Sequence, residues 1–420
     1  MFRALLNAFK IKELRNRILF TIGILALYRF GSNLTIPGVD AAVIFEQVQE
    51  GVMGLMDLFS GGGLGRFAVF SLGIMPYITA TIIMQLLQVV IPKLEQLAKE
   101  GETGRRKINQ ISRYFTVFLA IVQSVAMTFY FKNFGAIPNF NWMTVTLIVL
   151  TLTAGTTVIM WLGELINLHG IGNGISLIIF ASIVSRIPGG LISLFRIKGT
   201  NWFLIGLFAI LSVGVVVGIV LMQQGERRIP VQYAKRIVGR KVFGGQSTYI
   251  PLKVNQSGVM PIILAVSLLL FPATLAQFIN VKWLQTLANY LSPSIGGRVN
   301  VVYVVVYSIL IIAFAYFYTA ISFNPHDTSE NLRKYGGYIP GLRPGKNTTD
   351  FLSNVLNRIT LPGSIFLAII AILPEILIDT MGIPFKFGGT SVLIAVSVGL
   401  ETMKWIESQL MMRDYEGFIK

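Results

Sequence analysis

Glycine-rich runs are the first candidates for chemistry in this chain, because such runs hold phosphate groups in nucleotide-binding proteins. The runs are Gly61-Gly62-Gly63-Leu64-Gly65 and Gly170-Ile171-Gly172-Asn173-Gly174. Neither follows a predicted strand of a βαβ unit, and neither ends in Gly-Lys followed by Ser or Thr, so both are weak nucleotide sites. We interpret residues 60–65 as a flexible hinge and residues 170–174 as a tight turn.

Nucleophiles and metal ligands are scarce. The chain has no Cys, which excludes disulfides, thiolate metal sites and cysteine nucleophiles. Its two histidines, His169 and His326, stand in different loops, so a histidine-based metal or catalytic cluster is not expected. We therefore expect no catalytic site, no cofactor and no metal, and we disfavour an intramembrane enzyme.

Long apolar stretches must form the framework. We count ten, each near the length that crosses a hydrocarbon layer of about 30 Å as a helix. The sequence thus predicts an all-α polytopic membrane protein with ten transmembrane helices. The stretches are Ile18–Ile36, Met75–Ile91, Tyr114–Phe131, Val145–Leu165, Ile171–Ile187, Trp202–Met222, Gly258–Ile279, Val301–Phe323, Ile359–Ile378 and Gly388–Leu410.

Lysine and arginine are unevenly divided between the segments that join these stretches. One side carries 26 of the 35 basic residues, counting Lys404 near the end of the last stretch, and the other carries 8, counting Arg186 at the end of the fifth; Arg29 lies inside the first stretch. Basic loops resist translocation, so the rich side is predicted to be cytoplasmic and to hold both ends of the chain. The net charge of +16 follows largely from this topology, and anionic lipids are an expected partner. Residues 1–17 are predicted to be a cytoplasmic amphipathic helix.

The stretches divide into two halves, residues 18–187 and 202–410, joined by an outer hinge at 188–201. Because each half has five stretches, the halves start from opposite sides of the membrane, and any structural repeat must be inverted. This architecture fits either a channel between the halves or a secondary transporter for a small solute. A transporter would carry paired charges near mid-membrane, whereas the few ionisable residues here lie near the ends of the stretches, which favours the channel.

A series of motifs runs in order along the chain. They are Asp57–Arg66 (DLFSGGGLGR), Leu72–Gln85 (LGIMPYITATIIMQ), Glu100–Lys107 (EGETGRRK), Gly170–Ile175 (GIGNGI), Tyr233–Arg236 (YAKR), Pro251–Asn255 (PLKVN), Phe323–Pro325 (FNP), Pro340–Gly345 (PGLRPG) and Phe387–Ser391 (FGGTS). Together they closely resemble the SecY family of protein-translocation channels. The resemblance covers essentially the whole chain and is more specific than any single motif.

The resemblance implies a central hourglass pore between the halves, which passes secreted polypeptides outward and releases membrane helices sideways into lipid. An apolar, β-branched ring would seal it, because the side chains are stiff and the constriction dewets when empty. On composition alone, an isoleucine in these stretches more often faces lipid or packs against other helices, so only the motif match selects the ring. Ile179, one helical turn before Ile183, is a further candidate for the ring. The matching positions are Ile78, Ile82, Ile183, Ile263 and Ile394.

The resemblance also implies a plug and a lateral gate. The outer gap Pro37–Ile74 is long and mildly apolar, so we expect it to fold back between the helices. Within it, residues 57–71 match the family's plug, a short movable helix, with Asp57, Gly61, Gly62, Gly63 and Arg66 as its marked positions. Gln88 and Asn255 match polar positions of the lateral gate, although each could equally cap a helix end.

Two long cytoplasmic loops are the predicted docking surface. Residues 223–256 carry seven basic residues against one acidic, and residues 324–357 are nearly balanced in charge. The resemblance implies that they bind the SecA ATPase or the ribosome and its RNA. It further implies SecE and SecG as small membrane subunits, signal sequences and unfolded polypeptides as substrates, the bacterial plasma membrane as location, and 411–420 as a cytoplasmic tail. The docking candidates are Arg236, Arg240, Lys241 and Arg343.

Overall fold

The structure is a computed structural model that describes residues 8–48, 51–196, 202–233, 236–238, 241–243, 247–278, 281–295, 298–381 and 389–417. Each predicted apolar stretch falls mainly on one helix. In the first half these helices are α2 (Lys12–Gly31), α5 (Met75–Val90), α7 (Glu102–Asn133), α8 (Trp142–His169) and α9 (Gly174–Val184). In the second half they are α11 (Trp202–Gln224), α12 (Met260–Phe278), α14 (Val301–Ser322), α16 (Lys346–Met381) and α17 (Gly389–Gly417).

Fewer of these helices meet a strict test of length and apolarity. Within the described residues, five are long and apolar enough to cross a membrane, or six if the bent pair α5 and α6 (Pro92–Lys99) is one span. The pair bends by 100° because Pro92 begins α6 and forces Ile91 into an extended conformation. α9 has only 11 residues, and α2 begins with charged residues. The number of ten spans therefore stays a prediction.

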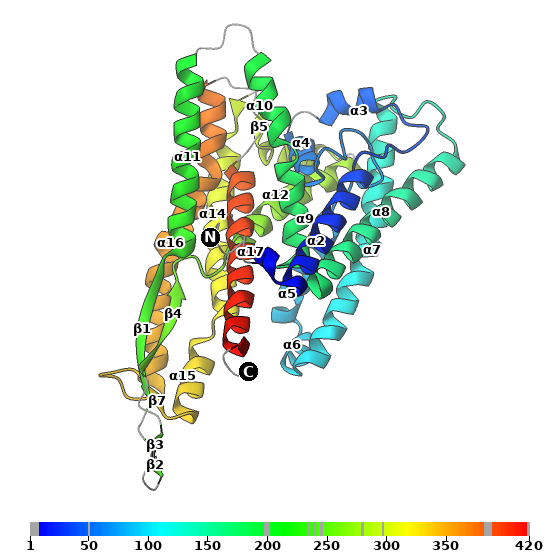
Figure 1. The fold of residues 1–420 in the computed structure, drawn as a ribbon. Helices are drawn as coiled ribbons and strands as arrows, with labels where there is room; N and C mark the ends of the chain where they lie inside the picture. The colour runs from blue at the N-terminus through cyan, green and yellow to red at the C-terminus, as the bar shows by residue number, and fades with distance from the viewer. Residues whose placement is uncertain are drawn as a thin grey trace.

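The two halves lie side by side (Figure 1). α7 and α8 stand at one edge of the view, α11, α14 and α16 stand at the other, and α5, α9, α12 and α17 lie between them. The halves meet where α12 contacts α5 and α7, and where α17 contacts α9. A single cluster of packed apolar side chains extends through both halves. We name the two sides outer and cytoplasmic, after the prediction from charge.

The outer segment, residues 32–74, belongs to this common core. It holds α3 (Ala41–Val48) and α4 (Gly51–Phe59), and residues 60–74 form turns with a single bridge between Thr35 and Ala68. The helix thus covers only the first three residues of the predicted plug, 57–71, and lies mainly before it. Further short outer elements are α10 (Ile187–Arg196), α13 (Lys282–Tyr290), β5 (Ser294–Ile295) and β6 (Arg298–Val299).

The cytoplasmic loops form a small domain that the sequence had not predicted as a sheet. β1 (Glu226–Tyr233) pairs with β4 (Ser247–Lys253) on one side and with β7 (Gly337–Tyr338) on the other, all antiparallel. β2 (Arg236–Val238) and β3 (Lys241–Phe243) extend the hairpin. With α15 (Pro325–Lys334) and the start of α16, the sheet encloses a second, separate apolar cluster. We call residues 226–253 with 325–356 the cytoplasmic domain.

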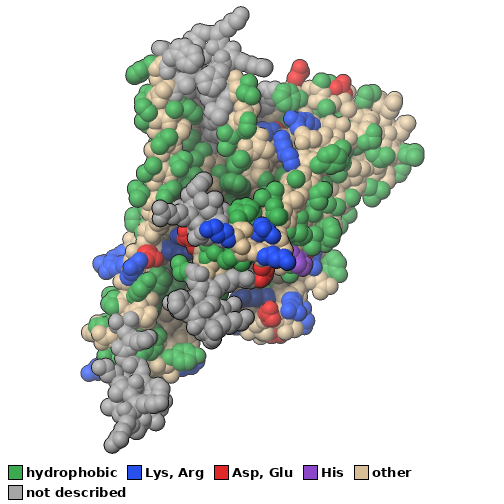
Figure 2. All heavy atoms as spheres, viewed as in Figure 1, with side chains coloured by type: hydrophobic (Ala, Val, Ile, Leu, Met, Phe, Trp, Pro, Cys, Tyr) green, Lys and Arg blue, Asp and Glu red, His purple; other side chains and the backbone are tan. Residues whose placement is uncertain are grey.

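Side chains divide over the surface in the same sense. In Figure 2, hydrophobic side chains spread over the helices, and most of the Lys and Arg in view lie in the lower half of the molecule. On α11, large apolar side chains point outward: Ile210, Val213 and Leu221 are each at least 64% exposed. Such a helix is stable only in an apolar surrounding, which fits a multi-pass membrane protein.

Candidate functional site

The five ring candidates all join the common core. Ile78, Ile183, Ile263 and Ile394 are buried, and Ile82 is half-buried and packs against the same cluster. They come from four helices of both halves: α5 carries two, and α9, α12 and α17 carry one each. The structure thus brings both halves together around apolar side chains, as a seal requires.

The glycines of the plug motif end a helix. The N–H of Gly62 donates to the carbonyl of Asp57 (2.9 Å), and the N–H of Gly61 donates to that of Leu58 (3.2 Å). This pair of bonds is a Schellman motif, in which Gly61 takes the left-handed position with φ of 67°. Residues 60–65 therefore form a compact cap on α4, and the hinge role inferred for them from composition stays a prediction.

Polar side chains from α2 and α9 hold this cap. The Tyr28 hydroxyl shares a hydrogen bond with Ser182 (2.6 Å) and donates to the carbonyl of Ser60 (3.2 Å). The guanidinium of Arg29 donates to the carbonyl of Gly61 (2.6 Å). Ser182 directly precedes the ring candidate Ile183, so the cap lies against the backbone that carries part of the ring.

Asp57 lies in the last turn of α4 and is the charged residue beside the cap. Its carboxylate forms an ion pair with Arg186, which follows the end of α9, and also accepts the N–H of Gly65 (2.8 Å). The Asp57 side chain is only 7% exposed and that of Arg186 is 28% exposed. The remaining plug candidates lie in the same region: Gly63 is buried, and exposed Arg66 bonds to Asn33.

Residues 67–71 of the outer segment are held instead by backbone hydrogen bonds and by a close contact with α8. Ile36 donates to the carbonyl of Phe67 (3.0 Å), and Val69 donates to the carbonyl of Leu34 (2.8 Å). Gly155 of α8 has no room for a Cβ because the Val69 carbonyl lies directly against it. Residues 67–71 are thus held against the first half, so we expect any movable part of the predicted plug to lie before Phe67.

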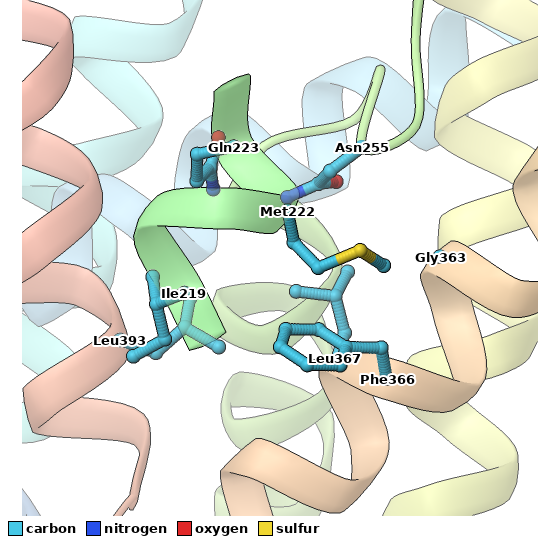
Figure 3. A pocket seen from close by; sticks show the side chains of 8 residues that line it. All are labelled: Ile219, Met222, Gln223, Asn255, Gly363, Phe366, Leu367 and Leu393. Atoms are coloured by element: carbon cyan, nitrogen blue, oxygen red, sulfur yellow. The ribbon is translucent and has the colours of Figure 1, made fainter. Parts of the chain in front are cut away.

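The lateral-gate candidates do not bond to each other. Gln88 lies half-buried near the end of α5, whereas Asn255 is buried and uses its amide locally, donating to the carbonyl of Gly258 (3.0 Å) and accepting from Ser257 (3.2 Å). Asn255 also lines a small pocket with residues of α11, α16 and α17 (Figure 3). The Asn255 amide holds the turn before α12 rather than capping a helix end. The lateral gate stays a prediction, at the contacts of α12 with α5 and α7.

The docking candidates lie in or near the cytoplasmic domain. Arg343 is exposed at the turn before α16, between Gly341 and Gly345, which both have positive φ. The turn is fixed because Thr348 donates to the Arg343 carbonyl (3.0 Å) and Ser329 donates to the Gly345 carbonyl (2.9 Å). Strands β2 and β3 carry Arg236 and Lys241, whose side chains, like the whole of Arg240, lie outside the described residues.

An ion pair on α15 lies on the exposed surface of the cytoplasmic domain. Lys334 bonds to Glu330 (3.2 Å), and this hydrogen bond and the positive charge hold the pKa of the Glu330 carboxyl below its usual range. Both groups are exposed, so the pair contributes little to stability.

Sequence reasoning missed the partners of the plug. Tyr28, Ser182 and Arg186 were not singled out, and Arg29 was noted only as a charge inside the first stretch. Arg29 had one usable signal, since it is a charge within an apolar stretch. The others had none, because Ser182 and Arg186 lie more than a hundred residues from the groups that they bind.

Comparison with known proteins finds relatives that match the whole length of the chain. The SecY family model matches residues 68–403. The chain is 46% identical over 447 aligned residues to the "Protein translocase subunit SecY" of Streptomyces scabiei, with 100% of both chains covered. It is likewise 47% identical over 438 residues to the subunit of the same name from Halalkalibacterium halodurans, again with both fully covered.

A solved structure has the same fold. One described as a protein conducting channel superposes with a TM-score of 0.64 at 21% identity, and covers 94% of this chain and 92% of that one. At that identity the likeness concerns the fold alone. The motifs, the family model and the relatives of equal length lead to one conclusion. The chain belongs to the SecY family.

Proposed function

We propose that the chain is the channel-forming subunit of a protein translocase, which passes unfolded secretory polypeptides outward and releases hydrophobic segments sideways into lipid. Family membership makes it a translocase channel subunit rather than a small-solute transporter. Such a subunit has no need of catalysis, so the driving energy comes from a bound motor, from translation or from the membrane potential.

One observation carries the proposal. The five ring isoleucines and the buried residues Leu64, Phe67 and Leu72 of the outer segment belong to the same apolar cluster, where the two halves meet. A pore closed by apolar side chains and backed by a folded segment blocks ions, because water does not wet such a constriction. The same pore can widen, because packing between apolar surfaces has no fixed hydrogen bonds to break.

The proposal assigns partners by surface. SecA or the ribosome docks on the cytoplasmic domain and Arg343, whose planar fork suits carboxylates and phosphates. SecE and SecG pack against the exposed apolar helices, and anionic lipids meet the basic face. Signal sequences enter where α12 meets α5 and α7. The location is the bacterial plasma membrane, with both ends of the chain cytoplasmic.

Reconstitution tests the proposal. The chain, with its small subunits, is placed in lipid vesicles and supplied with the motor, ATP and a secretory precursor. We expect the precursor to become protected from added protease, and only when its signal sequence is present. Uptake of a small solute without any protection of the precursor would favour the transporter instead.

A further inference from the structure

We propose that Asp57 and Arg186 form a latch that determines how strong a signal sequence must be to open the channel. This inference rests on the proposed role of the outer segment as a plug. The latch joins the C-terminal turn of α4 to the residue beyond the end of α9, and hence the plug to the helix that carries Ile183. It assigns Arg186 a role in substrate selection.

The carboxylate of Asp57 is fully occupied in the closed state. One oxygen, Oδ2, faces the Arg186 guanidinium, and the other, Oδ1, accepts the N–H of Gly65 at 2.8 Å. The Asp57 side chain is almost fully covered, and Arg186 is half-buried. An ion pair in such a place is costly to break, because separation leaves one charge without its partner in a poorly solvated site.

A second guanidinium strengthens the closed state. A Cβ built at Gly61 would lie 3.5 Å from Nη1 of Arg29, and one built at Gly62 would lie 3.2 Å from Nη2 of Arg186. The two arginines therefore flank adjacent glycines of the cap, and both bind groups of the plug. If the plug leaves, both lose those partners and two like charges remain near each other without the Asp57 carboxylate.

The backbone of each arginine is fixed by the structure around it. Arg186 lies in the turn between α9 and α10, where its N–H donates to the carbonyl of Ile183 (3.1 Å) and its carbonyl accepts the N–H of Gly190 (3.0 Å). Arg29 belongs to the last turn of α2. The latch thus breaks only by movement of the plug, and its contacts favour the closed state alone.

This difference in stability between the closed and the open channel determines which signal sequences can open it. A signal sequence opens the channel only if its own binding free energy exceeds the stabilisation of the closed state. Strong signals exceed it with the latch present, whereas weak signals do so only when the latch is removed. Removing the latch should therefore raise export of weak-signal substrates more than export of normal ones.

The test compares Asp57→Asn, Arg186→Gln, Arg186→Lys and the double variant D57N/R186Q in reconstituted vesicles with motor and small subunits. The new amide in Asp57→Asn can still accept the Gly65 N–H, so the cap is kept while the charge is lost. Lys282→Gln is the matched control, because Lys282 is an exposed basic residue of α13, on the outer side but outside the plug. The readout is the export of a precursor with a charge placed in its signal, divided by the export of the intact precursor.

We expect Asp57→Asn and Arg186→Gln to raise this ratio on the order of tenfold, and the double variant no further, because each change already removes the same interaction. Arg186→Lys should stay near the unaltered protein, as should Lys282→Gln. Normal export of the intact precursor shows that each variant is folded. Ratios at the unaltered level for both single variants, or an additive rise in the double variant, would overturn the latch.

A channel that lacks residues 60–65 separates the latch from the plug. If this deletion raises the ratio but the two charge variants do not, then the plug stands and the latch is wrong. If the deletion also leaves the ratio unchanged, the proposed role of the outer segment fails.

Discussion

The outer segment and the cytoplasmic domain are both long connections between helices, but they are built differently. Among its described residues the outer segment has no separate core: its buried side chains, such as Leu64 and Phe67, join the cluster formed by the helices of both halves. The cytoplasmic domain encloses a separate cluster around Ile229, Val231 and Leu352. We therefore expect the shape of the outer segment to depend on how the halves pack, and the cytoplasmic domain to keep its shape.

This difference suits two roles. A segment that shares the core of the pore must move or repack when the halves separate, because its contacts change with them. A domain with its own core can present Arg343 on a fixed turn and transmit force from a bound partner without unfolding. Changes to the cytoplasmic domain should therefore affect docking, and changes to the outer segment should affect closure.

The largest expected effect is on docking. Arg343→Glu should abolish motor-driven export while leaving the resting seal intact, since an exposed charge contributes little to stability but its reversal repels the partner. Arg358→Glu is the control, because Arg358 is another exposed arginine, on α16. ATPase stimulation and precursor protection are measured together. Normal values for Arg343→Glu would remove this residue from the docking surface.

The next effect is on the fold of the cytoplasmic domain. Leu352 is fully buried in its cluster, so Leu352→Ala should destabilise the domain by about 2–5 kcal/mol, as large-to-small core substitutions do. Hydrogen exchange should rise in β1 and β4 and stay unchanged in the outer segment. Leu361→Ala, at a 52% exposed position of α16, should change neither. Equal rises in both regions would contradict separate cores.

A smaller effect is expected in the seal. Ile394→Ser should wet the constriction and raise the resting ion conductance in planar bilayers, because Ile394 is 1% exposed within the common core. Ile82→Ser should act in the same direction but less, since Ile82 is only half-buried. Ile309→Ser, at a 60% exposed position of α14, serves as the control. Unchanged conductance in all ring variants and their combinations would exclude these residues from the seal.

The smallest expected effect concerns the stability that the Glu330–Lys334 pair gives to the cytoplasmic domain, which depends on pH. The pKa of Glu330 is lowered by Lys334, so their pair stabilises the folded domain above the ordinary carboxyl pKa and this contribution is lost as the pH falls through the lowered value. Because both groups are exposed, Glu330→Gln should leave the thermal midpoint of the domain almost unchanged at neutral pH. A clear drop would show that α15 depends on this pair.

The sequence predicted the helices better than the connections. Apolar stretches and basic loops are local signals, so the helix positions and the family resemblance could both be found without a structure. β1 was missed because its alternation is short: Ile229 and Val231 are turned inward between charged and polar neighbours, and Tyr233 packs against the same cluster. The Asp57–Arg186 pair was missed because 129 residues separate its members and no local pattern joins them.

The most direct test locks the cap of the plug against α9. A Cβ built at Gly61 would lie 3.4 Å from the Cβ of Ser182, close to the range of about 3.5–4.5 Å found in disulfides. The chain has no other cysteine, so the double variant Gly61→Cys with Ser182→Cys can form only this bond within the chain. Oxidised Gly61→Cys alone is the control. We predict that oxidation of the double variant blocks precursor export and that reduction restores it; full export through the oxidised channel would contradict a movable plug.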